Sequence, residues 1–138
     1  MNNTNRLFYK NLIEFLMHLK HRLYEVAIAN DLSSMQLIMI LSLGVNQSES
    51  MNYFKRLFNC DASNITNIAD ALVKKQIISR SESPEDRRIK ELKLLPKGEK
   101  LQHKILEELK SADAVDFFSM DKTQILKMSD YLRNWSEN

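Results

Sequence analysis

The sequence is poor in the residues that break a chain or cross-link it. Its 138 residues include 2 Gly, 2 Pro and a single Cys. So few turn-forming residues argue against an all-β fold and against a disordered chain. Neither a Gly-rich dinucleotide motif nor a P-loop occurs. One Cys excludes an internal disulfide framework and any zinc site built from several cysteines.

The sequence also lacks a long apolar run and a strong charge of one sign. No stretch approaches the roughly 18 apolar residues of a membrane span, and the first residues lack the basic-then-apolar layout of a secretion signal. We therefore expect a cytoplasmic protein without a membrane partner. Lys and Arg number 20 and Asp and Glu 18, but residues 50–104 hold 12 basic against 7 acidic residues. The positive charge is thus concentrated in the middle of the chain.

Helical periodicity dominates what is present. Hydrophobic residues make up 43% and charged residues 28% of the chain, a balance typical of one globular domain. Apolar residues recur at helical spacing in six segments. These helices are expected over about 6–30, from 34 onward, over about 51–58 and 62–76, from 96 onward and from about 121 onward. Ser33, Asp61 and Asp121 are predicted N-caps, and Gly44 and Asn59 are predicted to end helices.

The period changes to that of a β-hairpin after the fourth helix. Residues 77–81 and 89–95 are predicted strands, and the polar tip between them contains Pro84. Residues 46–49 are predicted to form a loop. Two short helices joined by a tight turn and followed by a basic hairpin define a winged helix-turn-helix. We therefore predict a mainly α (α+β) fold.

The fourth helix carries a polar face suited to reading DNA. In such a module the second helix of the pair enters the major groove, and hydroxyl and amide side chains bind several base edges. The predicted reading residues are Ser63, Asn64, Thr66 and Asn67. Phosphate or minor-groove contacts are predicted for Lys55, Lys74, Arg80, Arg87 and Arg88. The alternative interpretation is an ordinary solvated helix face and a solvated turn.

The wing carries the sharpest resemblance to a known family. Its sequence is Ser83-Pro84-Glu85-Asp86-Arg87-Arg88, followed by a strand and then Lys97-Gly98. It resembles the wing signature of the MarR family of bacterial transcription regulators. The stretch from Leu32 to Gln36 and the stretch from Asp61 to Thr66 are similar to the family's second helix and recognition helix.

The resemblance implies an obligate homodimer that binds a near-palindromic double-stranded DNA operator. Residues 1–138 would form one domain, with dimerisation helices at about 6–30 and 97–138 and a winged region at about 33–95. Arg88 would enter the minor groove, and Asp86 would brace the wing by pairing with a nearby Arg. We expect a repressor, with an activator as the alternative, that responds to a small-molecule effector or a stress signal. We expect no enzyme activity, no cofactor and no metal.

The chain departs from the family at five positions, one of which is Leu95, where a small hydroxyl cap before the fifth helix is usual. Arg is usual at Asn67 and frequent at Ala71, and Gly is usual at Asn59 and Gln76. A recognition helix without these Arg residues suggests an alternative function, a winged-helix protein-interaction module (an anti-regulator) with little DNA binding. An enzyme is disfavoured because no nucleophile–base pair or carboxylate pair stands at a useful spacing.

Large apolar residues gather near both ends of the chain, where one subunit has little to cover them. They are Phe8, Leu12, Phe117, Phe118, Leu126 and Trp135. Burial in a dimer is the favoured explanation, and a loose terminal core is the alternative.

Three further groups of residues have both a functional and a packing interpretation. Cys60 is expected to be buried packing rather than a redox sensor. His18, His21 and His103 are more typical of solvated histidines than of metal ligands. A Met and aromatic group is more typical of a core, although the family resemblance implies an effector pocket nearby. Its members are Phe15, Met17, Tyr24, Met35 and Met39.

Overall fold

In the computed structural model, six helices and three short strands make up the described part of the chain, residues 2–110 and 120–137. The helices are α1 (Asn3–Ala29), α2 (Ser34–Ser42), α3 (Met51–Phe58), α4 (Ala62–Lys74), α5 (Pro96–Lys110) and α6 (Lys122–Ser136). The strands are β1 (Ser48–Ser50), β2 (Ile78–Glu82) and β3 (Lys90–Leu94). The predicted mainly α winged helix-turn-helix is confirmed.

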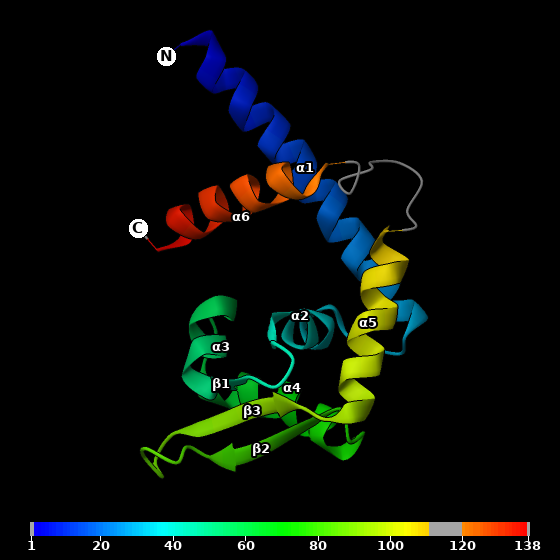
Figure 1. Cartoon of the computed structure of the whole chain (residues 1–138), viewed down its shortest axis with the longest axis vertical. Helices are drawn as coiled ribbons and strands as arrows, with labels where there is room; N and C mark the ends of the chain where they lie inside the picture. Colours follow the sequence, from blue (N-terminus) through cyan, green and yellow to red (C-terminus); the bar gives the residue numbers. More distant parts are fainter. Residues whose placement is uncertain (1, 111–119, 138) are drawn as a thin grey trace.

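The elements divide into a winged unit and helices that extend away from it. Helices α2, α3 and α4 surround the sheet at one end of the molecule, and α1 and α6 lie toward the other end (Figure 1). Helix α5 begins beside the sheet and contacts α1, α2 and β3. It therefore connects the winged unit to the long N-terminal helix.

Most of the core lies inside the winged unit, and Val26 and Ala27 of α1 and Ile105 of α5 complete it. Helix α4 buries Ile65, Ala69 and Leu72, and β3 buries Leu92 and Leu94. Helix α2 is apolar nearly all round and buries Leu37, Met39 and Ile40. A short helix of this kind has no solvent face to spare.

Two leucines of the helices that pack on the core are exposed. Leu57 and Leu106 are 47% and 40% exposed. Helix α3 packs through Phe54 and Phe58, which are four residues apart, so Leu57 lies at the flank of that face. Leu106 follows the fully buried Ile105, and successive residues of a helix point about 100° apart.

The predicted helix caps are confirmed. The Ser33 hydroxyl accepts from the Gln36 backbone N–H at 3.1 Å, and the Gln36 side chain accepts from the Ser33 N–H at 3.0 Å. Asp121 caps α6 with the same reciprocal pair of bonds to Gln124, whereas Asp61 caps α4 only by accepting from the Asn64 backbone N–H at 3.0 Å. Gly44 follows the C-cap residue of α2 as predicted, although its φ is not positive.

Four described residues other than glycine adopt the left-handed conformation, namely Asp31, Asn46, Asn59 and Gln76, and the last two adjoin the helices of the helix-turn-helix. Asn59, which ends α3, has φ 48°, and Gln76, which follows α4, has φ 59°. The first was predicted from the tolerance of Asn for this region. Both are positions where the resemblance to the MarR family implies Gly, the residue that adopts this conformation at least cost.

The sheet contains a strand that the sequence analysis missed. Residues 48–50 pair antiparallel with β3, and the strand order is β1-β3-β2. The prediction of a loop at residues 46–49 is therefore wrong for residues 48 and 49, which belong to β1. Three polar residues give no alternating apolar pattern, and this strand is held by the free edge of β3. Ser50 then caps α3 by accepting from the Tyr53 N–H at 3.0 Å, which ties the sheet to the helix-turn-helix.

Helices α1 and α6 leave apolar side chains uncovered. Of the predicted dimerisation residues, Phe8, Leu126 and Trp135 are 59%, 55% and 69% exposed, and Leu12 is half-buried. No residue of α6 is buried. Phe117 and Phe118 lie outside the described residues. Among the described helices, none combines the length and the apolarity needed to cross a membrane.

Candidate nucleic-acid interface

The first two turns of α4 present a polar surface. Ser63, Asn64 and Asn67 are exposed, and Thr66 is half-buried. Asp61 begins the helix, and its pKa is held below the ordinary range by the Asn64 backbone N–H and then by the Ser63 hydroxyl, both of which donate to its carboxylate. The predicted recognition face therefore begins at a fixed, ionised cap.

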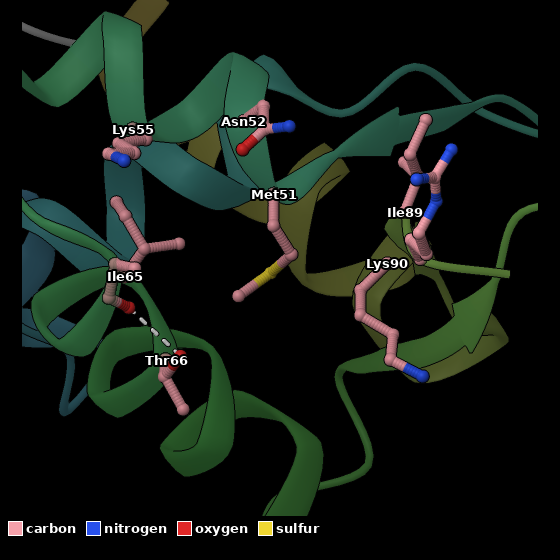
Figure 2. Close-up of a pocket in the computed structure, with 9 residues that line it drawn as sticks. Met51, Asn52, Lys55, Ile65, Thr66, Ile89 and Lys90 are labelled. Carbon is pink, nitrogen blue, oxygen red and sulfur yellow. Dashed lines mark hydrogen bonds between the residues drawn. The ribbon is translucent and has the colours of Figure 1, made fainter. Parts of the chain in front are cut away.

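The hydroxyl and amide groups of this face differ in their hydrogen bonds. Ser63 donates to the Asp61 carboxylate at 2.9 Å, and Thr66 donates to the Ala62 carbonyl oxygen at 2.9 Å (Figure 2). Within the described chain, the side-chain amides of Asn64 and Asn67 make no hydrogen bond. The two amides are therefore the groups with both donors and acceptors available.

The tip of the wing is organised around one carboxylate. The guanidinium of Arg88 donates to Asp86 through Nε and Nη2, each at 3.2 Å, and the Arg88 backbone N–H donates at 3.0 Å. These bonds, the side-chain bond first, hold the pKa of Asp86 below its ordinary value. The Arg88 side chain is nevertheless 90% exposed. The expected pairing of Asp86 with a nearby Arg is thus present, and Arg87 beside it is also exposed.

A groove joins the wing to the helix-turn-helix. Its cavity is about 180 Å³, and it brings together the predicted residues Lys55, Thr66 and Arg88. The other lining residues are Met51, Asn52, Ala62, Ile65, Ile89 and Lys90. Figure 2 shows Met51 between the α4 residues and Lys90 of the wing. An apolar floor with cations at its rim suits a polyanion that lies across the groove.

Arg80 does not stand free at this surface. Its guanidinium is 2.8 Å from the carboxylate of Asp70, so it ties β2 to α4. It also lines a neighbouring groove of about 400 Å³ with Thr66 and Lys90, and Lys90 pairs with Glu82 at 3.1 Å. Lys74, in contrast, is the last residue of α4 and lines neither groove. The predicted cations are therefore not equivalent.

Several residues of the groove were not predicted as site residues. They are Met51, Asn52, Ala62, Ile65 and Ile89. Asn52 lies three and four residues before Lys55 and Arg56, so helical spacing places it on their polar face. That spacing is the signal that could have found it.

The remaining candidates stay apart from the interface. Cys60 is half-buried, not fully buried as expected, because it lies at the open turn between α3 and α4. His18, His21 and His103 are exposed. The described residues contain no group of three or more side chains placed to hold a metal ion. Met17 and Tyr24 are also exposed, whereas Met39 is fully buried.

Part of the chain matches a known protein family. Residues 32–90 match the model of the MarR family. A search of curated proteins by sequence gives no significant match.

Solved structures extend the likeness to nearly the whole chain. A MepR mutant from a multidrug-resistant S. aureus clinical isolate is 16% identical, with a TM-score of 0.73 over 94% of this chain and 95% of that one. A mutant MarR from E. coli complexed with operator DNA is 18% identical, with a TM-score of 0.61 over 97% and 98%. CouR from Rhodococcus jostii RHA1 bound to p-coumaroyl-CoA is 20% identical, with a TM-score of 0.67 over 88% and 86%. At these identities the likeness is one of fold.

Proposed function

We propose that the chain is a DNA-binding transcriptional regulator that acts as a homodimer, because its residues 32–90 match the model of the MarR family. One observation carries the proposal. Thr66 of the α4 polar face and the braced Arg88 of the wing line the same groove, together with Lys55. Helix α4 would enter the major groove while the wing reaches the adjacent minor groove or backbone.

The two kinds of residue at this surface have different tasks in the proposal. Ser63, Asn64, Thr66 and Asn67 contact base edges. Lys55, Lys74, Arg87 and Arg88 contact phosphates or the minor groove, and each neutralised phosphate releases counterions. Arg80 acts mainly through Asp70, because its charge is already paired on the protein.

The exposed apolar helices support the proposed dimerisation. Residues of about 6–30 and 97–138 would pair with a second copy, since Phe8, Leu126 and Trp135 are more than half exposed in a single chain. A two-fold dimer presents two recognition helices to half-sites about one helical turn apart.

The dimer is proposed to repress by occupying its operator, and a small ligand would release it. Binding of CouR to p-coumaroyl-CoA supports an effector of this kind for a protein of the same fold. The ligand would act only if it bound more tightly to a dimer whose helices are spaced wrongly for DNA.

Fluorescence anisotropy tests the proposal. The probe is the duplex upstream of the protein's own coding sequence, titrated at several salt concentrations with unlabelled random DNA as competitor. Binding that survives the competitor and weakens with salt supports a DNA-reading regulator. Arg88→Ala is expected to weaken binding about ten-fold or more, and Lys20→Ala, which removes an exposed cation on α1 rather than on the winged unit, is the charge-matched control.

The competing function has its own observation. Exposed Asn67 and half-buried Ala71 leave the recognition face without a cation before Lys74. Weak binding that is equal for random DNA and identical in the Arg88 variant would contradict DNA reading. It would favour a winged-helix protein-interaction module instead.

A further inference from the structure

The recognition helix has an unusual donor set for a DNA reader. Between Ala62 and Val73 it contains no Lys or Arg. Bidentate Arg or Lys is the commonest way to read guanine in the major groove. The bases that α4 reads must therefore be recognised by amides, hydroxyls and methyl groups.

The side-chain amides of Asn64 and Asn67 fit adenine. Both are exposed, and both retain a donor and an acceptor because no described group bonds to either amide. An Asn amide pairs with the N6 donor and the N7 acceptor of adenine. Residues three apart on a helix are about 5–6 Å apart at Cβ, and bases of one strand rise about 3.4 Å per step. The two amides therefore match adenines one or two steps apart.

Thr66 presents a methyl group rather than a hydroxyl. Its Oγ1 donates to the Ala62 carbonyl oxygen at 2.9 Å, so the hydroxyl proton is already used within the helix (Figure 2). A half-buried side chain with its hydroxyl turned to the backbone offers its methyl to the ligand. In the major groove the apolar partner for a methyl is the C5-methyl of thymine.

The wing points to the same base composition independently. Arg88 is 90% exposed, while Asp86 fixes its orientation through two side-chain hydrogen bonds. An exposed Arg is attracted into a narrow minor groove, because the negative potential is enhanced there. A-tracts have the narrowest minor grooves.

We propose that this chain reads an A·T-rich half-site. Asn64 and Asn67 bind adenines, the Thr66 methyl packs on a thymine between or beside them, and Arg88 enters the narrow minor groove of a flanking A-tract. This inference rests on the proposed function, and it goes further by assigning the class of DNA and the residue that reads each feature.

The experiment begins with selection from a duplex library that has about 20 randomised base pairs, enough for two half-sites one turn apart. The selected duplex is then remade with single-atom changes. Deoxyuridine in place of thymidine removes only the C5-methyl, and 7-deazaadenine removes only the N7 acceptor. Binding of each duplex is measured by anisotropy at one salt concentration.

The expected losses are specific to side chain and position. One deoxyuridine weakens binding about three- to five-fold. The Thr66→Ser variant, which keeps the hydroxyl but lacks the methyl, binds the thymidine and deoxyuridine duplexes equally. One 7-deazaadenine weakens binding about two- to ten-fold, and Asn64→Ala or Asn67→Ala removes that difference at its own position. Lys20→Ala retains every difference.

The outcomes separate this inference from the function beneath it. Enriched A·T-rich sequences with these losses support the assignment. Enrichment of G·C-rich half-sites overturns the assignment while DNA binding stands. So does binding of the deoxyuridine and 7-deazaadenine duplexes that is as tight as binding of the unmodified duplex. A library from which no duplex is enriched overturns both.

Discussion

At the scale of single residues, the wing is ordered before any partner arrives. Asp86 receives two side-chain bonds and one backbone bond from Arg88. A free Arg side chain loses up to about 2 kcal/mol of rotamer entropy when it is fixed. Because the brace fixes much of the side chain in the free protein, less of this cost falls on DNA binding.

The brace predicts how Asp86 titrates. Its pKa is lowered first by the Arg88 side chain and then by the Arg88 backbone N–H. A carboxylate with a lowered folded-state pKa stabilises the fold above its ordinary pKa, and this contribution is lost as pH falls through the lowered value. In Arg88→Ala the pKa should rise toward the ordinary value but stay below it, because the backbone bond remains. Carboxyl-carbon NMR against pH measures this. Asp61, whose pKa is lowered by other donors, is the internal control, and an unchanged Asp86 midpoint would refute the brace.

The left-handed turn after α4 predicts a stabilising substitution. Gln76 has φ 59°, a region that costs a residue with a Cβ about 1–2 kcal/mol but costs Gly little. Part of this gain is offset because Gly is more flexible in the unfolded chain. Gln76→Gly should therefore raise the free energy of unfolding by about 0.5–1 kcal/mol in urea titrations. Ala71→Gly, inside α4, should lower it by about 1 kcal/mol. A loss of stability in both variants would contradict the strain argument.

At the scale of elements, a close approach explains why α5 needs a glycine in its first turn. An ideal Cβ on Gly98 would lie 2.1 Å from the Ile77 carbonyl oxygen. That same oxygen accepts from the Leu95 backbone N–H at 3.0 Å. The start of α5 is thus seated against the backbone that joins α4 to β2, which sets how the helix leaves the winged unit.

The two glycines of the chain provide a matched test of that contact. Gly98→Ala should lower the free energy of unfolding by about 1–3 kcal/mol, since backbone must shift, although Ala alone favours a helix by about 1 kcal/mol. At Gly44 the added Cβ would meet only the Gln47 side chain, whose Oε1 is 2.5 Å away and can rotate aside. Gly44→Ala should change stability by less than about 0.5 kcal/mol. Urea unfolding at one protein concentration distinguishes them, and equal effects would refute the close-contact explanation.

Local signals explain which elements could be predicted from the sequence. The apolar period of α4 and the caps Ser33 and Asp61 involve residues close in the chain, so both were predicted. Strand β1 was not predicted, because its only support is the edge of β3, some forty residues later. The Asp70–Arg80 pair joins a helix to a strand. Arg80 was therefore predicted to be a free cation, since sequence spacing does not show which distant charge will meet it.

At the scale of the whole molecule, the two ends of the structure differ in how well they are covered. The winged unit closes a core in which Phe54, Leu72 and Leu92 are fully buried. Helices α1 and α6 instead expose large apolar side chains, among them Tyr131 at 73% and Trp135 at 69%. A single chain rarely leaves so many of these in contact with water.

Pairing with a second copy predicts that charge on α6 will separate the subunits and weaken DNA binding together. Trp135→Asp should raise the dimer dissociation constant about thirty-fold or more, because a large interface aromatic contributes at least about 2 kcal/mol, and sedimentation equilibrium measures this. The exposed Lys127→Ala variant of the same helix should remain dimeric. In Trp135→Asp, the affinity for a duplex with two half-sites should fall as the dimer weakens, since one subunit holds only one recognition helix. The winged core does not involve α6, so circular dichroism of Trp135→Asp should remain helical.

A wild-type chain that is a stable monomer at micromolar concentration would contradict the dimer itself. If Trp135→Asp separated the subunits without loss of affinity, the coupling between dimerisation and DNA binding would be refuted.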